Sequence, residues 1–148
     1  MIARPPASSV RHRGAGDRVF LDANVLFSAA FRPNSALLLL WAISTDCTLL
    51  CSPYAIEEAR RNLEEPDARE RLMLLVAGLE LVPDVVTGEL PAGVTLPEKD
   101  IPILLAAIAA GATHLLTGDR AHFGAHFGRR VARVLIQRPG DYLAALRG

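Results

Sequence analysis

The strongest constraint on the fold is a series of short apolar runs separated by segments with helical character. Each run is almost free of polar residues, so both faces of each predicted strand should be buried. Strands of this kind that alternate with helices are typical of a parallel sheet covered on both sides. The sequence therefore predicts a three-layer α/β fold with a central parallel sheet of about five strands. The predicted strands are VFL (19–21), CTLLC (47–51), LELV (79–82), THLLT (113–117) and VARVLI (131–136).

The segments between these strands carry helix start and stop signals. Serine followed by proline at Ser52-Pro53 marks the start of a helix that should run to about Asn62. Asp100 opens a long apolar helix, which Gly111 ends as a C-cap. Other helices are predicted over 23–30, 35–45 and about 67–77, and from Pro139 through Leu146, with a loop over 84–97.

Length and composition suit one domain. The chain has 148 residues, of which 51% are hydrophobic, and charged or turn residues interrupt every apolar run before it could span a bilayer. We interpret residues 1–18 as a flexible basic arm before a domain over 19–148. The arm lacks the apolar core of a secretory signal, which predicts a cytoplasmic protein with no membrane contact. Cys47 and Cys51 fall on a predicted strand and are interpreted as core thiols.

The basic residues produce no global positive field, because 16 basic residues balance 16 acidic ones. All of them except Lys99 are arginines, whose guanidinium groups suit phosphates. Genome composition and solubility explain the same arginines equally well, so both interpretations stay open. Several of the arginines lie in the arm and several near the C-terminus, at Arg4, Arg11, Arg13, Arg18, Arg129, Arg130, Arg133 and Arg138.

Three aspartates fall where predicted strands or a buried helix should meet one edge of the sheet. Asp22 directly follows the first strand, and Asp119 follows the fourth. Asp100 begins a helix with no charge over its next ten residues, so this helix should be nearly engulfed and start at the same edge. Each has a simpler explanation, since Asp22 and Asp100 could be N-caps and Asp119 a turn residue.

A group of carboxylates at one edge is unfavourable unless a cation neutralises it, because like charges repel. Glu58 is a fourth candidate, although the helical spacing hardly separates it from Glu57. Oxygen ligands favour Mg²⁺ or Mn²⁺ over zinc. The residues themselves therefore predict an acidic edge that binds a divalent cation.

Four segments together resemble the PIN domain family of nucleases, from Val19 to about Leu146. The last of them is similar to the end of PIN toxins from bacterial toxin–antitoxin systems. An aspartate and an asparagine after a strand would be weak evidence alone, but the ordered set with its TGDRAHF ending is specific. The segments are VFLDANVLFSA, SPYAIEEARRNL, EKDIPILLAAIAAGATHLLTGDRAHF and VLIQRPGDYL.

The resemblance implies a Rossmann-like parallel sheet and metal-dependent hydrolysis of RNA phosphodiester bonds. It implies that Asp22, Asp100 and Asp119 hold a first Mg²⁺ or Mn²⁺ ion. Glu58 would orient the attacking water, directly or through a second ion. The family register, which places this glutamate five residues before an apolar residue such as Leu63, selects Glu58 over its neighbour.

The resemblance also supplies supporting residues and one departure. Thr117 and Asn24 would hold the carboxylates by hydrogen bonds, and Ser28 is a common companion in the first motif. Lys99 stands where relatives often have another acid, which reduces the charge available for a second ion. Glu98 could compensate for it.

The partners that the resemblance implies are an RNA substrate, an antitoxin protein and, as a further option, a second copy of the chain. The alternative is a non-catalytic PIN-like module that binds RNA or protein without turnover. The presence of all four acids, Asp22, Glu58, Asp100 and Asp119, argues for the enzyme.

A zinc ion and stacked nucleic-acid bases are two other ligands that fit the sequence less well. His122 and His126 have the spacing of a zinc pair, but no glutamate completes the motif and Gly124 weakens the helix, so we set zinc aside. His122 could still meet substrate, because it follows Asp119. Aromatic residues make up only 5% of the chain, so the phenylalanines and Trp41 are interpreted as core or dimer contacts.

The chain lacks the residues that other α/β classes of protein require. A receiver domain needs a lysine after the last strand, where this chain has Arg138. A haloacid-dehalogenase-type phosphatase needs a second aspartate two residues after the first, where Asn24 stands. No glycine-rich nucleotide loop is present in the sequence.

Overall fold

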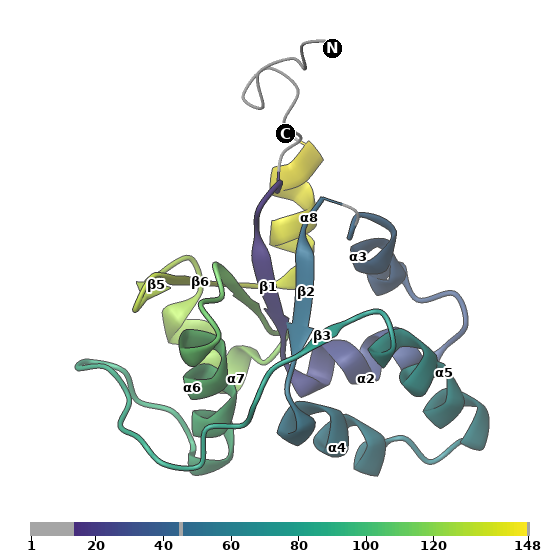
Figure 1. The fold of residues 1–148 in the computed structure, drawn as a ribbon, viewed down its shortest axis with the longest axis horizontal. Coiled ribbons are helices and arrows are strands. Elements are labelled where there is room, and N and C mark those ends of the chain that lie inside the picture. The colour runs from purple at the N-terminus through teal and green to yellow at the C-terminus, as the bar shows by residue number, and fades with distance from the viewer. Residues whose placement is uncertain (1–13, 45, 148) are drawn as a thin grey trace, which may run out of the picture.

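A six-stranded sheet forms the centre of the protein (Figure 1). The structure is a computed structural model that describes residues 14–44 and 46–147, so most of the predicted basic arm lies outside the described residues. Five strands are parallel and the edge strand β5 is antiparallel to β6. Across the sheet the strands are β3 (Glu80–Leu81), β2 (Thr48–Cys51), β1 (Arg18–Leu21), β4 (His114–Leu116), β6 (Val134–Gln137) and β5 (Arg130–Val131).

Helices cover both faces of this sheet, which confirms the predicted three-layer α/β fold. In Figure 1, α6 and α7 lie on one side of the central strands, and α2, α4 and α5 lie on the other. The helical elements are α2 (Ala23–Phe31), η1 (Ala36–Leu38), α3 (Leu39–Ala42), α4 (Pro53–Asn62), α5 (Pro66–Val76), η2 (Glu98–Asp100), α6 (Ile101–Ala109), α7 (Arg120–Phe123), η3 (Gly124–His126) and α8 (Pro139–Arg147).

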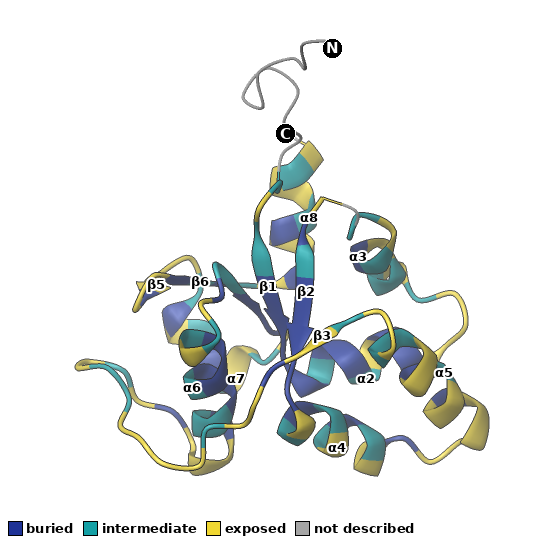
Figure 2. Cartoon of the chain, in the orientation of Figure 1, coloured by how far each residue is buried: buried dark blue, intermediate teal, exposed yellow. Residues whose placement is uncertain are grey.

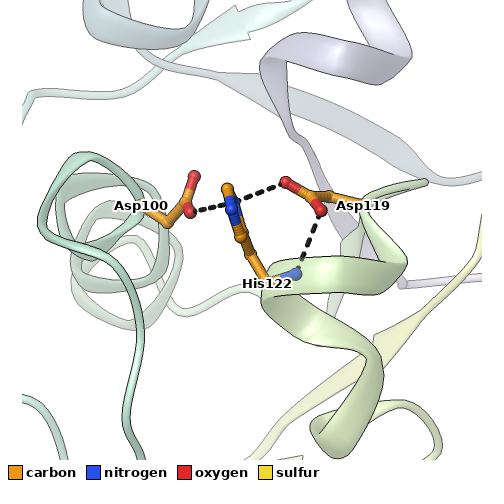
Figure 3. Close-up of side chains that lie close together, drawn as sticks. All are labelled: Asp100, Asp119 and His122. Carbon is orange, nitrogen blue, oxygen red and sulfur yellow. Dashed lines mark hydrogen bonds and ion pairs between the residues drawn. The ribbon is translucent and has the colours of Figure 1, made fainter.

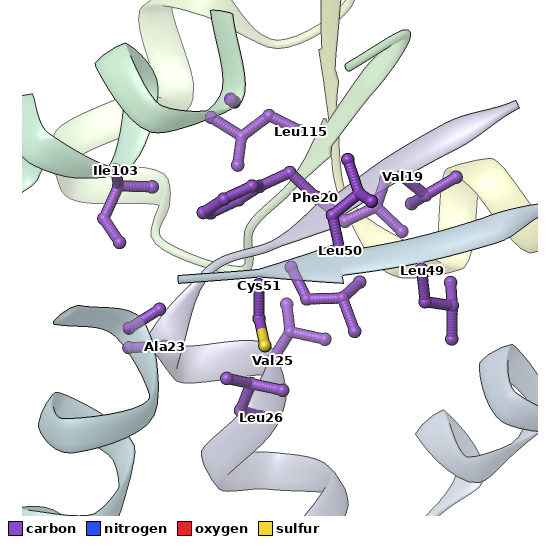
Figure 4. Close-up of a cluster of buried hydrophobic side chains, with 14 of the residues drawn as sticks. Val19, Phe20, Ala23, Val25, Leu26, Leu49, Leu50, Cys51, Ile103 and Leu115 are labelled. Atoms are coloured by element: carbon purple, nitrogen blue, oxygen red, sulfur yellow. The ribbon is translucent and has the colours of Figure 1, made fainter. Parts of the chain in front are cut away.

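The central strands are buried on both faces, as their apolar runs predicted (Figure 2). The register aligns Phe20 of β1 with Leu50 and Leu115 on its two neighbours, so these side chains share one face of the sheet. Ile103 of α6 lies on their side, whereas Cys51 points to the opposite side, toward α2 (Figure 4). Burial of apolar surface on both faces is the main driving force that holds the three layers together.

The predicted helix signals correspond to observed helix ends. The Ser52 hydroxyl accepts a hydrogen bond from the Ala55 amide, and Pro53 is the first residue of α4. Helix α6 ends at Ala109, and Gly111 follows with a φ of 69°. Residues 82–97 contain no helix or strand, as predicted for 84–97.

The last predicted strand differs from the structure. Residues 131–136 do not form one strand, because the chain reverses between β5 and β6 at Ala132 and Arg133. Both of these residues have positive φ, 47° and 75°, as a two-residue hairpin turn requires. Asparagine or glycine usually marks such a turn, so this sequence carried no signal for it.

Two further predictions concern the membrane and the cysteines. No single helix among the described residues is long and apolar enough to cross a membrane. Helix α2 and the η1–α3 segment are together long and apolar enough, but the chain bends by 113° between them. Cys47 and Cys51 are buried free thiols.

Candidate metal centre

Asp22 and Thr117 meet because β1 and β4 end side by side. Leu21 pairs with Leu116 in the register, and Asp22 and Thr117 are the next residues on the two strands. The Asp22 side chain is buried and uses both of its oxygens. Oδ1 accepts a hydrogen bond from the Ala23 amide (2.7 Å) and so caps α2, whereas Oδ2 accepts one from the Thr117 hydroxyl (2.8 Å). The N-cap role considered from the sequence is thus only half of its function.

Asn24 joins this pair to the loop after β4. Its amide nitrogen donates to Asp22 Oδ2 and to Thr117 Oγ1, both at 3.1 Å, and its oxygen accepts from the Gly118 amide at 2.8 Å. Thr117 Oγ1 also accepts from the Asp119 amide at 3.1 Å. These bonds fix the orientation of the Asp22 carboxylate. Ser28 is exposed, and its side chain makes no hydrogen bond among the described residues.

Asp100 lies at the end of η2, directly before α6, and is only 4% exposed. Its side chain makes no capping hydrogen bond to α6, so the simple N-cap interpretation of this residue is wrong. Its Oδ2 is buried and has no hydrogen-bond partner among the described residues. The carboxylate instead faces the imidazole of His122, whose Nδ1 lies 2.8 Å from Oδ2 (Figure 3).

Asp119 divides its two oxygens between α7 and this cluster. Oδ1 accepts a hydrogen bond from the His122 amide (3.0 Å) and caps α7, and Oδ2 lies 2.8 Å from His122 Nδ1. The imidazole therefore stands between two carboxylates, as Figure 3 shows. Neither contact has the alignment of a hydrogen bond, so the buried Nδ1 has no hydrogen-bond partner within residues 14–44 and 46–147.

The sequence predicts that His122 could meet substrate, because it follows Asp119, but it does not indicate a contact with the carboxylates. His126, which has the spacing of a zinc pair with His122, is buried elsewhere, and its Nε2 lies 3.4 Å from the Thr95 carbonyl oxygen. A different spacing is informative. An N-capping aspartate binds the amide of the residue three positions later, so Asp119 as a cap holds His122 beside it.

The structure distinguishes the two neighbouring glutamates of α4. Glu58 lines the same cleft as the aspartates. Glu57 is exposed and forms an ion pair with Arg60 (2.7 Å), and the hydrogen bond from Arg60 lowers the pKa of Glu57. Helix α4 packs against α2 and α6, which turns Glu58 toward the carboxyl edge of the sheet.

One cleft of about 460 Å³ therefore contains all four predicted acids. At the side of Asp100 and Asp119, ligand atoms of these two residues and of His122 lie within 4.8 Å of one another. Asp22 and Glu58 line the cleft but stand outside this closest group. The cleft is lined by Asp22, Ala23, Asn24, Phe27, Glu58, Asn62, Lys99, Asp100 and Asp119.

Burial makes this collection of acids electrostatically costly. It raises the pKa of Asp22 to about 6, an effect that the hydrogen bonds from Thr117 and Ala23 partly offset. The charges of Asp100 and Glu58 raise the pKa of Asp22 further. Burial also raises the pKa of Asp100, against the opposing effect of Lys99 and His122. A divalent cation fits this donor set, because it would neutralise the acids and bind the unpartnered Asp100 oxygen.

Comparisons with known proteins agree on the fold. A family model described as a PIN domain matches residues 18–121, while no curated protein matches the chain significantly. Among solved structures, a chain in the crystal structure of VapBC2 from Rickettsia felis bound to a DNA fragment from their promoter is similar. It has 17% sequence identity and a TM-score of 0.63, and the match covers 82% of this chain and 98% of that one.

Replacing Asp22 with asparagine should stabilise the metal-free protein at neutral pH. The Asp22 pKa is about 6 in the folded protein and about 3.9 in an unfolded chain, so ionisation destabilises the fold progressively as pH rises between these values. In EDTA at pH 7.5 we expect D22N to exceed the wild type by about 1–3 kcal/mol in free energy of unfolding. The difference should shrink toward pH 4.5, as measured by denaturation followed by circular dichroism.

The matched control is D141N, because Asp141 is exposed and, among the described residues, its side chain pairs only with Arg138. This variant should change stability little at either pH. A D22N protein that is no more stable than the wild type at pH 7.5 would show that the buried charge is not costly.

Proposed function

The chain belongs to the PIN domain family, and on this basis we propose that it is a metal-dependent endoribonuclease that hydrolyses RNA phosphodiester bonds. The observation that carries the proposal is the single cleft shared by Asp22, Glu58, Asp100 and Asp119. Carboxylates gathered in one cleft, two of them buried, are destabilising unless they bind a cation, which supports a metal-dependent reaction.

The proposed cation is Mg²⁺ or Mn²⁺, held by Asp22, Asp100 and Asp119. When bound, it would polarise the scissile phosphate and make a water nucleophilic at neutral pH. Asp100 offers its buried oxygen that has no hydrogen-bond partner, and Asp119 offers the oxygen that does not cap α7. Thr117 and Asn24 keep the Asp22 carboxylate in one orientation, as supporting residues around a metal do.

Glu58 is proposed to orient the attacking water and accept its proton. The water oxygen forms a bond to phosphorus, and the bond from phosphorus to the leaving sugar oxygen breaks. Glu58 suits this role because it lines the cleft from α4 and makes no side-chain hydrogen bond or ion pair among the described residues. Its carboxylate is therefore free to accept the proton.

The glutamates of α4 provide the sharpest test. We expect E58Q to lower kcat on single-stranded RNA by about 100-fold or more, because general-base catalysis is lost. The matched variant E57Q loses only an exposed ion pair and should stay within about two-fold of the wild type. EDTA should stop cutting by the wild type. Equal effects of the two substitutions would refute the role of Glu58. Tight RNA binding without cutting, indifferent to EDTA, would favour the non-catalytic binding module.

Lys99 is proposed to bind the phosphate backbone of the substrate. It is the only lysine of the chain, it lines the cleft, and it forms no ion pair with the carboxylates in the described ranges. In a D119N background, which should not cut, we expect K99Q to weaken binding of a short single-stranded RNA. The slope of log affinity against log salt should fall by about 0.7, the value for one phosphate contact, while K99R keeps it. An unchanged slope in K99Q would exclude this contact.

We propose further that the enzyme is the toxin of a toxin–antitoxin pair in the cytoplasm and is silenced by a small cognate protein. The similar fold in VapBC2, which is bound to a DNA fragment from their promoter, supports an assembly with a second protein. We expect expression of the chain alone to arrest growth, and co-expression of the product of the adjacent small gene to restore it. D119N should not arrest growth. Normal growth with the active chain alone would contradict the toxin role.

A further inference from the structure

We propose that His122 is a direct ligand of the cation through Nδ1, and that the centre therefore selects Mn²⁺ and similar transition ions over Mg²⁺. This inference rests on the proposed function, since it concerns the ion of the same cleft. It replaces the oxygen-only ligand set that the sequence predicts with a mixed set, in which the imidazole joins the carboxylates.

The first argument is the spacing of the three ligand atoms. His122 Nδ1 lies 2.8 Å from Asp100 Oδ2 and 2.8 Å from Asp119 Oδ2. In an octahedral site with bonds of about 2.1 Å, neighbouring ligand atoms are about 3 Å apart. The nitrogen thus lies at the distance of a neighbouring ligand from each oxygen, and all three atoms lie within 4.8 Å of one another.

The second argument is that two of these atoms are buried without a hydrogen-bond partner. Asp100 is 4% exposed, and its Oδ2 and the Nδ1 of His122 both lack such a partner among the residues that the structure describes. Buried polar atoms are normally satisfied, so each one left over indicates a missing ligand or ion. A single cation between them would satisfy both atoms at once.

The local fold holds the imidazole in this place. The His122 amide donates to Asp119 Oδ1 at 3.0 Å, so the cap of α7 fixes both residues within one helical turn. Asp100 arrives from the start of α6, on a separate segment of the chain. Figure 3 shows the imidazole pointing from α7 toward the Asp100 carboxylate. The ring is therefore positioned by the backbone, as a preorganised ligand requires.

The preference for the ion follows from the donor type. Mg²⁺ binds almost exclusively to oxygen, whereas imidazole nitrogen suits transition ions. Asparagine at position 122 would offer an oxygen in place of the nitrogen. Loss of the imidazole should therefore weaken binding of Mn²⁺ more than binding of Mg²⁺.

The test uses the full chain with Mn²⁺ or Mg²⁺ alone. Pulsed electron paramagnetic resonance of bound Mn²⁺ should show coupling to a directly bonded nitrogen in the wild type and none in H122N. Labelling histidine with ¹⁵N should change this coupling without any substitution. By calorimetry we expect the ratio of Mn²⁺ to Mg²⁺ affinity to fall by about ten-fold or more in H122N. The control H126N should keep the nitrogen coupling, because His126 lies outside the cluster.

The outcomes separate this inference from the proposed function. A wild type that binds Mn²⁺ and cuts RNA but shows no nitrogen coupling would overturn the inference and leave the nuclease intact. An unchanged ratio of Mn²⁺ to Mg²⁺ affinity in H122N would also overturn the inference. His122 would then act as a counter-ion of the two aspartates. Nitrogen-coupled Mn²⁺ in a protein that cuts no RNA would support the ligand and refute only the nuclease. Binding of neither ion would overturn both.

Discussion

The parallel pairing of β1 with β4 is the interaction on which the rest of the site depends. It ends with Leu21 beside Leu116, so the next residue of each strand, Asp22 and Thr117, can form a 2.8 Å hydrogen bond. Asn24 can bond to both only because α2 begins immediately after β1. The register of the two strands, which apolar packing fixes, thus determines how the Asp22 carboxylate is oriented.

The buried acids that suit the site for a cation also lower the stability of the metal-free fold. Burial raises the pKa of Asp22 and of Asp100, and each ionised acid makes the metal-free fold less stable at neutral pH. The fold tolerates this cost because the surrounding helices and strands are densely buried and the hydrogen bonds of Thr117 and Asn24 offset part of it. Proteins commonly accept such strain where a ligand will relieve it.

The fold was predictable because each signal was local and repeated. The first four predicted strands were located to within about two residues, since their runs are short, mostly apolar and bounded by turn or helix signals. The edge strand β3 is nevertheless exposed. The hairpin between β5 and β6 was not predictable, because Ala132 and Arg133 adopt positive φ without the asparagine or glycine that usually announces it. There the tertiary pairing overrides the local preference of the residues.

The site residues that strand topology alone brings to the edge of the sheet were predictable. Those whose role depends on side-chain orientation were not. Asp22 and Asp119 follow strands, so topology brings them to one edge. Whether Asp100 caps its own helix or faces a cleft depends on how α6 meets the sheet, which no local spacing encodes. His122 needed the same information, because its partners are the cap of its own turn and an aspartate from another segment. A ligand set that joins distant segments is therefore visible only after the elements have been packed.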